Sequence, residues 1–135
     1  RLASCHKVAC VNDQVCGFLL VMRTGAPYRN DNFEWFSRTF SDFVYVDRIV
    51  VAAHSRGLGL GSRLYDHLFN WARERGIPRI TCEYNILPAN ELSRRFHETF
   101  GFREHGTQWV AQGTKRVSLQ AADTGTGERG STHPV

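Results

Sequence analysis

The chain has 135 residues, of which 41% are hydrophobic and 12% aromatic, so it is long enough for one domain with a real apolar core. Its 17 basic and 13 acidic residues give a formal net charge of +4, which suits an anionic ligand but is too small and too scattered to indicate nucleic-acid binding. It has no signal peptide and no apolar run long enough to span a bilayer, which favours a cytoplasmic protein without a membrane partner.

The four cysteines, at positions 5, 10, 16 and 82, show neither CxxC spacing nor a nearby His pair. This argues against zinc, and no other metal site is expected. Their apolar neighbours predict buried thiols in a reducing compartment. The chain begins with Arg1 and enters strand-like sequence within a few residues, so we expect an upstream segment to be absent.

The first elements predicted are two strands, over residues 7–11 and 15–22. They flank Asn12-Asp13-Gln14, which tolerates turn conformations, so we expect an antiparallel hairpin. Residues 23–42 combine structure-breaking residues with aromatic ones. This segment is either a long binding loop or a short helix that packs its aromatic side chains into the core.

A further strand is predicted over residues 43–51, interrupted by the polar pair Asp47-Arg48. Next comes Ser55-Arg56-Gly57-Leu58-Gly59-Leu60-Gly61-Ser62, and then an amphipathic helix that ends near Gly76. Glycines let the backbone turn tightly and approach a ligand, and a helix start presents unpaired N–H groups to an anion. The segment therefore predicts a phosphate-binding loop.

Residues 80–86 alternate apolar and polar side chains, which predicts a strand with one apolar face and one polar face. A second helix begins at Pro88-Ala89-Asn90 and stops at Gly101. Its predicted apolar stripe consists of Leu92, Phe96 and Phe100.

A closing hairpin is predicted from residues 109–111 and 115–120, which flank Gln112-Gly113. From Ala121 onward the sequence is rich in Gly, Thr and Ser, so we expect a domain over residues 1–120 and a flexible tail over residues 121–135. The order of elements predicts an α+β fold, with a mixed, mostly antiparallel sheet flanked by helices.

Two motifs resemble the GNAT superfamily of acyl-CoA-dependent N-acetyltransferases, over about residues 5–120. Arg56-Gly57-Leu58-Gly59-Leu60-Gly61 matches the family signature of Arg or Gln, two residues, Gly, one residue, then Gly or Ala. The second motif, Asn-x-x-Ala-x-x-Leu-Tyr-x-x-x-Gly-Phe, is matched in spacing by Asn90, Ser93, Phe96, His97, Gly101 and Phe102.

Competing phosphate motifs fit less well. A dinucleotide fingerprint needs Gly where Ser62 stands, and a P-loop needs a Lys beside its last Gly. The alternative without a ligand is that the glycines only close a tight corner between strand and helix.

The resemblance implies that backbone N–H groups from Leu58 to Ser62 hold the pyrophosphate of acetyl-CoA, while the strand before them offers main-chain groups to pantetheine. Arg56 would add a charge-assisted contact, although a solvated surface role is its alternative. Asn90 is expected near the cofactor or only as a helix cap. The expected cofactor-binding residues are Ile49, Val51, Arg56, Gly57, Leu58, Gly59, Leu60, Gly61, Ser62, Asn85 and Asn90.

The implied reaction is attack of a neutral amine on a thioester, which needs a base, an N–H donor for the oxyanion and a proton donor for the thiolate. The Val51 amide is the family-like oxyanion donor. Where the family usually has Tyr, this chain has His97, which is either the proton donor or a packed residue. Asp47 is the first choice for the base and Glu83 the second; Asp47 could instead form a structural ion pair, and water could carry the proton.

The acceptor site is the least defined part of the prediction. The family normally has a strand and one or two helices before the hairpin, which form one wall of that site, and this chain lacks them. We expect a small-molecule or peptide amine as acceptor, and a homodimer would cover an incomplete sheet edge. The alternative function is a non-catalytic acyl-CoA-binding or regulatory module of the same fold, favoured by His97 and by the missing wall.

Overall fold

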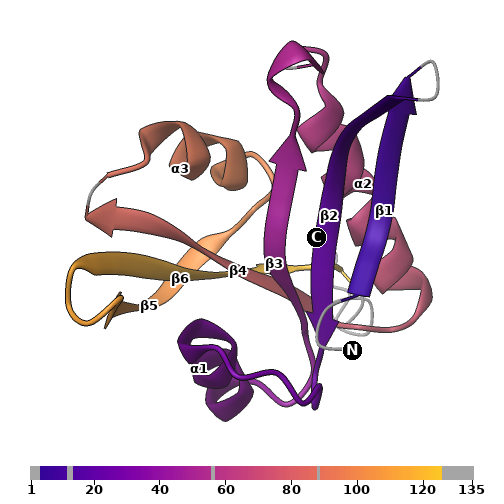
Figure 1. Ribbon diagram of the computed structural model, residues 1–135. Coiled ribbons are helices and arrows are strands. Elements are labelled where there is room, and N and C mark those ends of the chain that lie inside the picture. Colours follow the sequence, from indigo (N-terminus) through magenta and orange to yellow (C-terminus); the bar gives the residue numbers. More distant parts are fainter. Residues whose placement is uncertain (1–3, 12–13, 56, 88, 126–135) are drawn as a thin grey trace.

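The computed structural model describes residues 4–11, 14–55, 57–87 and 89–125, with side chains from residue 14 onward. The described strands form one sheet in the order β1-β2-β3-β4-β6-β5, antiparallel except for the pair β3–β4. This mixed sheet with its helices confirms the predicted α+β fold (Figure 1). The elements are β1 (Ser4–Val11), β2 (Gln14–Arg23), α1 (Asp31–Thr39), β3 (Val44–Val51), the 3-10 turn η1 (Ala53–Ser55), α2 (Leu60–Glu74), β4 (Arg79–Leu87), α3 (Glu91–Glu98), β5 (Arg103–Val110) and β6 (Lys115–Asp123).

Two apolar clusters lie on opposite faces of the sheet. The amphipathic helix α2 packs Leu64 and Leu68 against Val44 and Ile80 of the central strands, and α3 adds aromatic side chains to the same face. On the other face α1 contributes Phe33 and its neighbours to a second cluster with residues of β3 and β6. In Figure 1, α1 and α3 lie on opposite sides of β4 and β6.

The segment 23–42 contains a helix rather than a long loop. Asn30 caps α1, since its side-chain oxygen accepts hydrogen bonds from the N–H groups of Asn32 and Phe33 at 2.9 and 3.0 Å. The helix also contacts β5 closely, because a Cβ atom added to Gly106 would lie 2.6 Å from Trp35 Cζ2. Only glycine leaves room for Trp35 there, so this residue helps to hold α1 on the sheet.

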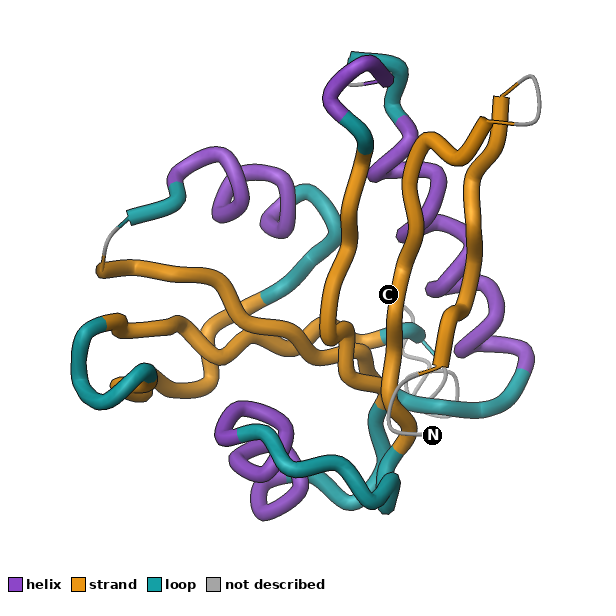
Figure 2. Tube along the Cα trace, viewed as in Figure 1, coloured by secondary structure: helices purple, strands orange, loops and turns teal. Residues whose placement is uncertain are grey.

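Strands β3 and β4 pair only briefly before they separate. Their parallel ladder consists of Val44 with Ile80 and Tyr45 with Thr81. Beyond these pairs β3 continues along β2, while β4 continues along β6, and Figure 2 shows the two strands diverging. The β2–β3 register shifts where Val46 and Arg48 face consecutive residues of β2, so Asp47 is the extra residue of a bulge.

Two sequence predictions need correction. Leu92 is 81% exposed and lies outside the apolar stripe of α3, because this helix turns Phe96 and His97 toward the sheet instead. The tail does not begin at Ala121, since β6 extends to Asp123 and Thr124 is buried, with its hydroxyl donating to the Ile77 carbonyl at 2.7 Å. Small alanines hid this strand extension. Residues 126–135 of the predicted tail lie outside the described residues.

The described cysteine side chains are Cys16 and Cys82, and both are buried free thiols, as the sequence predicted. The side chains of Cys5 and Cys10 lie outside the described residues. Among the helices of the described segments, none is long and apolar enough to cross a membrane.

Candidate active site

The glycine segment forms a tight turn that leads into α2. Gly57 and Gly59 have φ angles of +88° and +74°, a backbone region that glycine adopts at no steric cost. Gly59 is the N-cap of α2, has no side chain to cap the helix, and is followed by a first turn without acidic residues. The positive end of the helix dipole therefore meets no side-chain cap or carboxylate in this turn, which is what an anion site requires.

Other residues of the predicted loop have different surroundings. Arg56 lies outside the described residues. Leu58 and Ser62 are exposed, whereas the Leu60 side chain is buried in the core, so Leu60 can offer only its backbone. A Cβ atom on Gly61 would lie 3.3 Å from the Phe96 ring, so Gly61 also permits the close packing of α2 on α3.

The backbone of β3 is oriented toward the region where β4 leaves it. The Ala52 N–H donates to the Cys16 carbonyl at 2.6 Å, on the β2 side. Because hydrogen-bonding direction alternates along a strand, Val50 also faces β2, whereas the main-chain groups of Ile49 and Val51 point toward the β4 side. Their predicted orientation toward a pantetheine chain is therefore consistent with this register.

Asn85 and Asn90 lie at the opposite rim, where β4 ends and α3 begins. The Asn90 side chain caps α3 by accepting from the backbone N–H of Ser93 at 3.2 Å. The backbone N–H of Asn90 donates to the Asn85 carbonyl at 3.1 Å. Asn90 thus has the capping role that the sequence left as an alternative. A hollow of about 220 Å³ is lined by Tyr84, Asn85, Ile86, Ala89, Asn90, Glu91 and Arg94.

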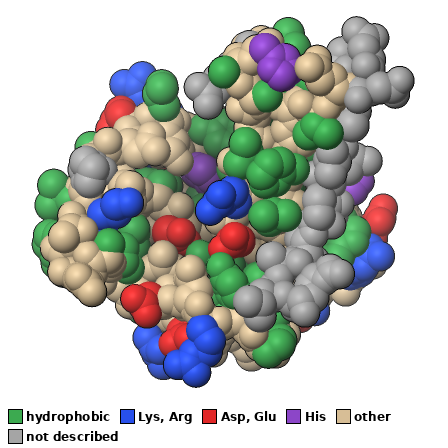
Figure 3. All heavy atoms as spheres, viewed as in Figure 1, with side chains coloured by type: hydrophobic (Ala, Val, Ile, Leu, Met, Phe, Trp, Pro, Cys, Tyr) green, Lys and Arg blue, Asp and Glu red, His purple; other side chains and the backbone are tan. Residues whose placement is uncertain are grey.

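The two predicted carboxylates meet tyrosine hydroxyls on the α1 face of the sheet. The Tyr28 hydroxyl donates to Asp47 Oδ1 at 2.6 Å, and the Tyr45 hydroxyl donates to Glu83 Oε1 at 2.7 Å. The capping residue Asn30 is 3.5 Å from the Tyr45 hydroxyl. Acidic side chains gather near the centre of the molecular surface that Figure 3 shows.

Burial sets the charge states in this cluster. It raises the pKa of Glu83 to about 7, with a further rise from the negative charge of Asp47, whereas hydrogen bonds from Tyr45 and Asn32 lower it. Burial and the hydrogen bond to Asp47 raise the pKa of Tyr28 to about 12, and burial also raises the pKa of Tyr45. Both tyrosines therefore stay protonated donors near neutral pH, where Glu83 gains or loses its proton.

Sequence reasoning missed the partners of these carboxylates. From the sequence, Asn30 and Asn32 are only structure-breaking residues of the segment 23–42, and no pattern assigns a role to Tyr28 or Tyr45. A capping pattern does exist in the sequence, with Asn30 followed by acidic residues in the first turn of α1. No sequence pattern, however, shows that this helix start contacts β4.

His97 lies in the core on the other face of the sheet and is only 5% exposed. Its Nδ1 is 2.7 Å from the Ser93 carbonyl, which can only accept, so Nδ1 carries the proton and Nε2 accepts from the Tyr65 hydroxyl at 2.8 Å. Burial lowers the pKa of His97, which favours this neutral form. His97 is therefore a packed residue, which is one of its two predicted roles; the role of proton donor stays a prediction.

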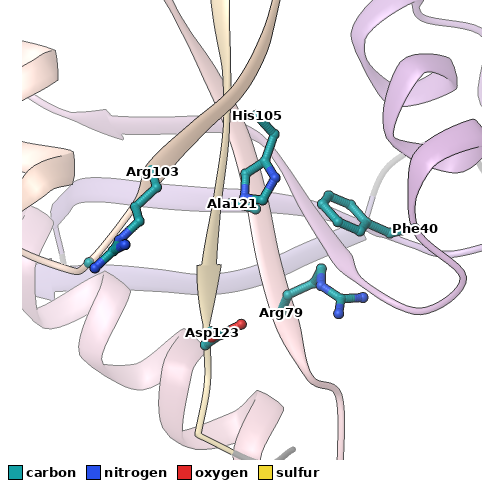
Figure 4. A pocket seen from close by; sticks show the side chains of 7 residues that line it. Phe40, Arg79, Arg103, His105, Ala121 and Asp123 are labelled. Atoms are coloured by element: carbon teal, nitrogen blue, oxygen red, sulfur yellow. The ribbon is translucent and has the colours of Figure 1, made fainter.

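A larger hollow of about 540 Å³ lies at the far end of β4 from Asn85, lined by Phe40, Arg79, Gly101, Arg103, His105, Ala121 and Asp123. Arg79 lies over the Phe40 ring, 4.5 Å from its centroid, and donates to the Asp42 carbonyl at 3.1 Å. Figure 4 shows the guanidinium groups of Arg79 and Arg103 pointing away from each other. This hollow therefore does not present converging charges to a ligand.

Comparison with known proteins gives consistent matches. Residues 1–102 match the model of the Acetyltransferase (GNAT) family. The chain is 30% identical over 73 residues to a phosphinothricin N-acetyltransferase of Streptomyces viridochromogenes, covering 54% of this chain and 39% of that protein.

Solved structures share the fold. A Bacillus anthracis protein in complex with acetyl coenzyme A matches with a TM-score of 0.65 and 22% identity, over 86% of this chain and 60% of that chain. The ribosomal-protein-S18-alanine N-acetyltransferase of Escherichia coli matches with a TM-score of 0.63 and 18% identity, over 85% and 65% respectively. The chain spans less than two thirds of the length of each of these three proteins.

The buried His97 predicts a pH-dependent stability. Its pKa is lower in the fold than the unfolded value of about 6.5, so its contribution is complete above that pH and is lost as the pH falls toward the folded pKa. His97→Phe should remove this part of the pH dependence and cost about 1–3 kcal/mol at pH 8, because the Tyr65 hydroxyl loses its acceptor. Urea unfolding of the wild type and of His97→Phe between pH 5 and 8 measures both the pH dependence of stability and the loss of stability at pH 8.

The matched control is His67→Phe, on the exposed surface of α2. If His97→Phe has the same pH dependence as the wild type, His97 does not titrate as a buried neutral group.

Proposed function

Since the chain belongs to the GNAT family of acetyltransferases, we propose that it transfers an acetyl group from acetyl-CoA to a primary amine, with Glu83 as the base. The observation that carries this proposal is that Asp47 and Glu83 lie on two diverging strands, and that burial raises the pKa of Glu83 to about 7. A base works best when its pKa lies near the working pH. This favours Glu83 over Asp47, the first choice from the sequence.

Three features support the placement of acetyl-CoA. The turn at Gly57 and Gly59 and the uncapped start of α2 suit a pyrophosphate. Ile49 turns its main-chain groups toward the side where β4 has separated, as a pantetheine amide would require. The bulge at Asp47 lies about 13 Å along the strand from Val51, so a ligand that follows β3 would bring its thioester end to the carboxylates. In this placement the Val51 amide contacts pantetheine, and it is too far from the thioester to be the oxyanion donor that the resemblance implies.

The chemistry then follows from the charges. Acetyl-CoA supplies an activated acyl group. The acceptor arrives as an ammonium, attracted by Asp47 and Glu83, and gives one proton to the Glu83 carboxylate. The neutral nitrogen attacks the thioester carbon, the C–S bond breaks, and the thiolate takes the second proton that the nitrogen loses. His97 needs no part in this scheme.

The acceptor is a small-molecule or peptide amine. Relatives carry names of both kinds, one for phosphinothricin and one for a ribosomal-protein alanine. The carboxylate pair and the tyrosines beside it indicate a cationic group but do not distinguish these two classes. A homodimer stays a prediction.

A second candidate function is a non-catalytic module that binds acyl-CoA. It is favoured by the buried His97, which occupies the position of the usual Tyr and has both ring nitrogens engaged in the core. Binding of CoA by calorimetry, without thiol release over a panel of amines, would support this module instead of the enzyme.

Glu83→Gln should lower turnover by about 100-fold or more, because the amide cannot accept the ammonium proton. Affinity for CoA should stay unchanged, since the Glu83 side chain bonds Tyr45 and is not among the groups proposed to hold the cofactor. In the wild type, turnover should rise with pH through about 7, as Glu83 loses its proton. A thiol-release assay with acetyl-CoA and an amine panel measures all three.

Glu74→Gln, at the exposed C-terminus of α2, is the matched control for this substitution. Retention of wild-type turnover by Glu83→Gln would show that another group, or water, takes the proton.

Gly59→Val should weaken CoA binding by about tenfold or more, because a β-branched side chain disfavours the positive φ and crowds the approach of a phosphate. Gly113→Val is the matched control, since Gly113 has a φ of +84° in the β5–β6 turn. Calorimetric titration with CoA compares the two. Equal affinities in both variants would place the pyrophosphate elsewhere.

A further inference from the structure

Gln108 of β5 is linked to Glu83, the candidate base, through the buried side-chain amide of Asn32 in α1. Its Nε2 donates to Asn32 Oδ1 at 3.0 Å. Asn32 is 7% exposed, unusually buried for a polar residue in the first turn of a helix. A side-chain hydrogen bond from Asn32 lowers the pKa of Glu83, which is the effect of an N–H donor, so the two ends of the Asn32 amide serve two different strands.

We propose that Gln108 is a positioning residue for the acetyl-transfer reaction: it fixes the orientation of the Asn32 amide, so that an N–H group and not the carbonyl oxygen faces Glu83. The inference rests on the proposed function only in taking Glu83 as the base. An ionised Glu83 also requires the N–H group, because a carboxylate can only accept, but a protonated Glu83 can donate to the Asn32 oxygen. The two ends of an amide have nearly the same shape, so Gln108 is the partner that opposes this reversed orientation.

The packing around this link is rigid. Trp35 of α1 fills the space over Gly106, two residues before Gln108 on the same strand. Asn30 at the N-cap holds the backbone N–H of Asn32 at 2.9 Å, which fixes the first turn of α1. The amide of Asn32 therefore has little freedom except rotation about its last bond, and this is the rotation that Gln108 controls.

The other groups that face Glu83 are accounted for. Tyr45 donates to the carboxylate, and Asp47 acts on it only through its negative charge. β6 places the apolar Leu119 opposite Glu83 in the ladder. Among the described residues, Tyr28, Tyr65 and Cys82 also interact electrostatically with Glu83. None of these reaches the Asn32 amide through a hydrogen bond among those described.

The test measures the protonation of Glu83 directly, without turnover. The side-chain carboxyl carbon of Glu83 is followed by NMR in the whole chain labelled with 13C-glutamate, and its signal is assigned with Glu83→Gln. In Gln108→Leu the midpoint should rise by about one pH unit, because the Asn32 amide can then reverse and accept a hydrogen bond from the protonated carboxyl, which stabilises the protonated form. Gln14→Leu, at the exposed start of β2, is the matched control and should leave the midpoint unchanged.

A double substitution identifies the route. Asn32→Leu alone should raise the midpoint as Gln108→Leu does, and adding Gln108→Leu should raise it no further. Gln108→Glu is the second variant in case Gln108→Leu does not fold: its carboxylate accepts from the Asn32 amide, turns the Asn32 oxygen toward Glu83 and raises the midpoint. An unchanged midpoint in Gln108→Leu, or a shift that persists in the Asn32→Leu background, would overturn the inference.

Activity separates this inference from the proposed function. If the NMR midpoint and the pH of half-maximal turnover both rise in Gln108→Leu, both proposals hold. If the NMR midpoint rises while the pH dependence of turnover stays the same, Gln108 still positions Asn32, and Glu83 is not the base.

Discussion

Strands β3 and β4 share only a short ladder, and both candidate sites lie where the two strands separate. Only two residue pairs join these parallel strands, and then each follows a different neighbour. The separation leaves main-chain groups of β3 directed toward a region without a paired strand, next to the start of α2. It also leaves Glu83 beside β3 without a ladder partner on that side. The cofactor site and the carboxylate site are two consequences of one divergence.

Burial of Glu83 gives the site its chemistry. The sequence pattern predicts a polar face for β4, and the structure shows that this face is covered, because Thr81 on it is fully buried. A carboxylate under such a cover resists ionisation, and the negative charge of Asp47 adds to this effect. Two neutral donors, Tyr45 and Asn32, offset part of the cost. The balance places the change of charge near neutral pH.

Local patterns were sufficient to predict the strands, α2 and the glycine turn, because alternation, four-residue spacing and glycine act within short segments. Contacts between distant segments could not be predicted in this way. The burial of His97 against Tyr65 and the position of Asn32 beside Glu83 depend on tertiary packing. The extension of β6 to Asp123 was missed because two alanines carry little apolar signal, although their backbone completes the ladder with β4.

The proposed base is Glu83, whose pKa is raised by burial and by the negative charge of Asp47. The most direct measurement is the pH dependence of acetyl transfer by Asp47→Asn. Removing the negative charge of Asp47 lowers the pKa of Glu83, so we expect an active enzyme whose turnover rises at a lower pH than in the wild type. Loss of turnover at every pH would contradict it and identify Asp47 as the base; an unchanged midpoint would show that Glu83 does not control the reaction.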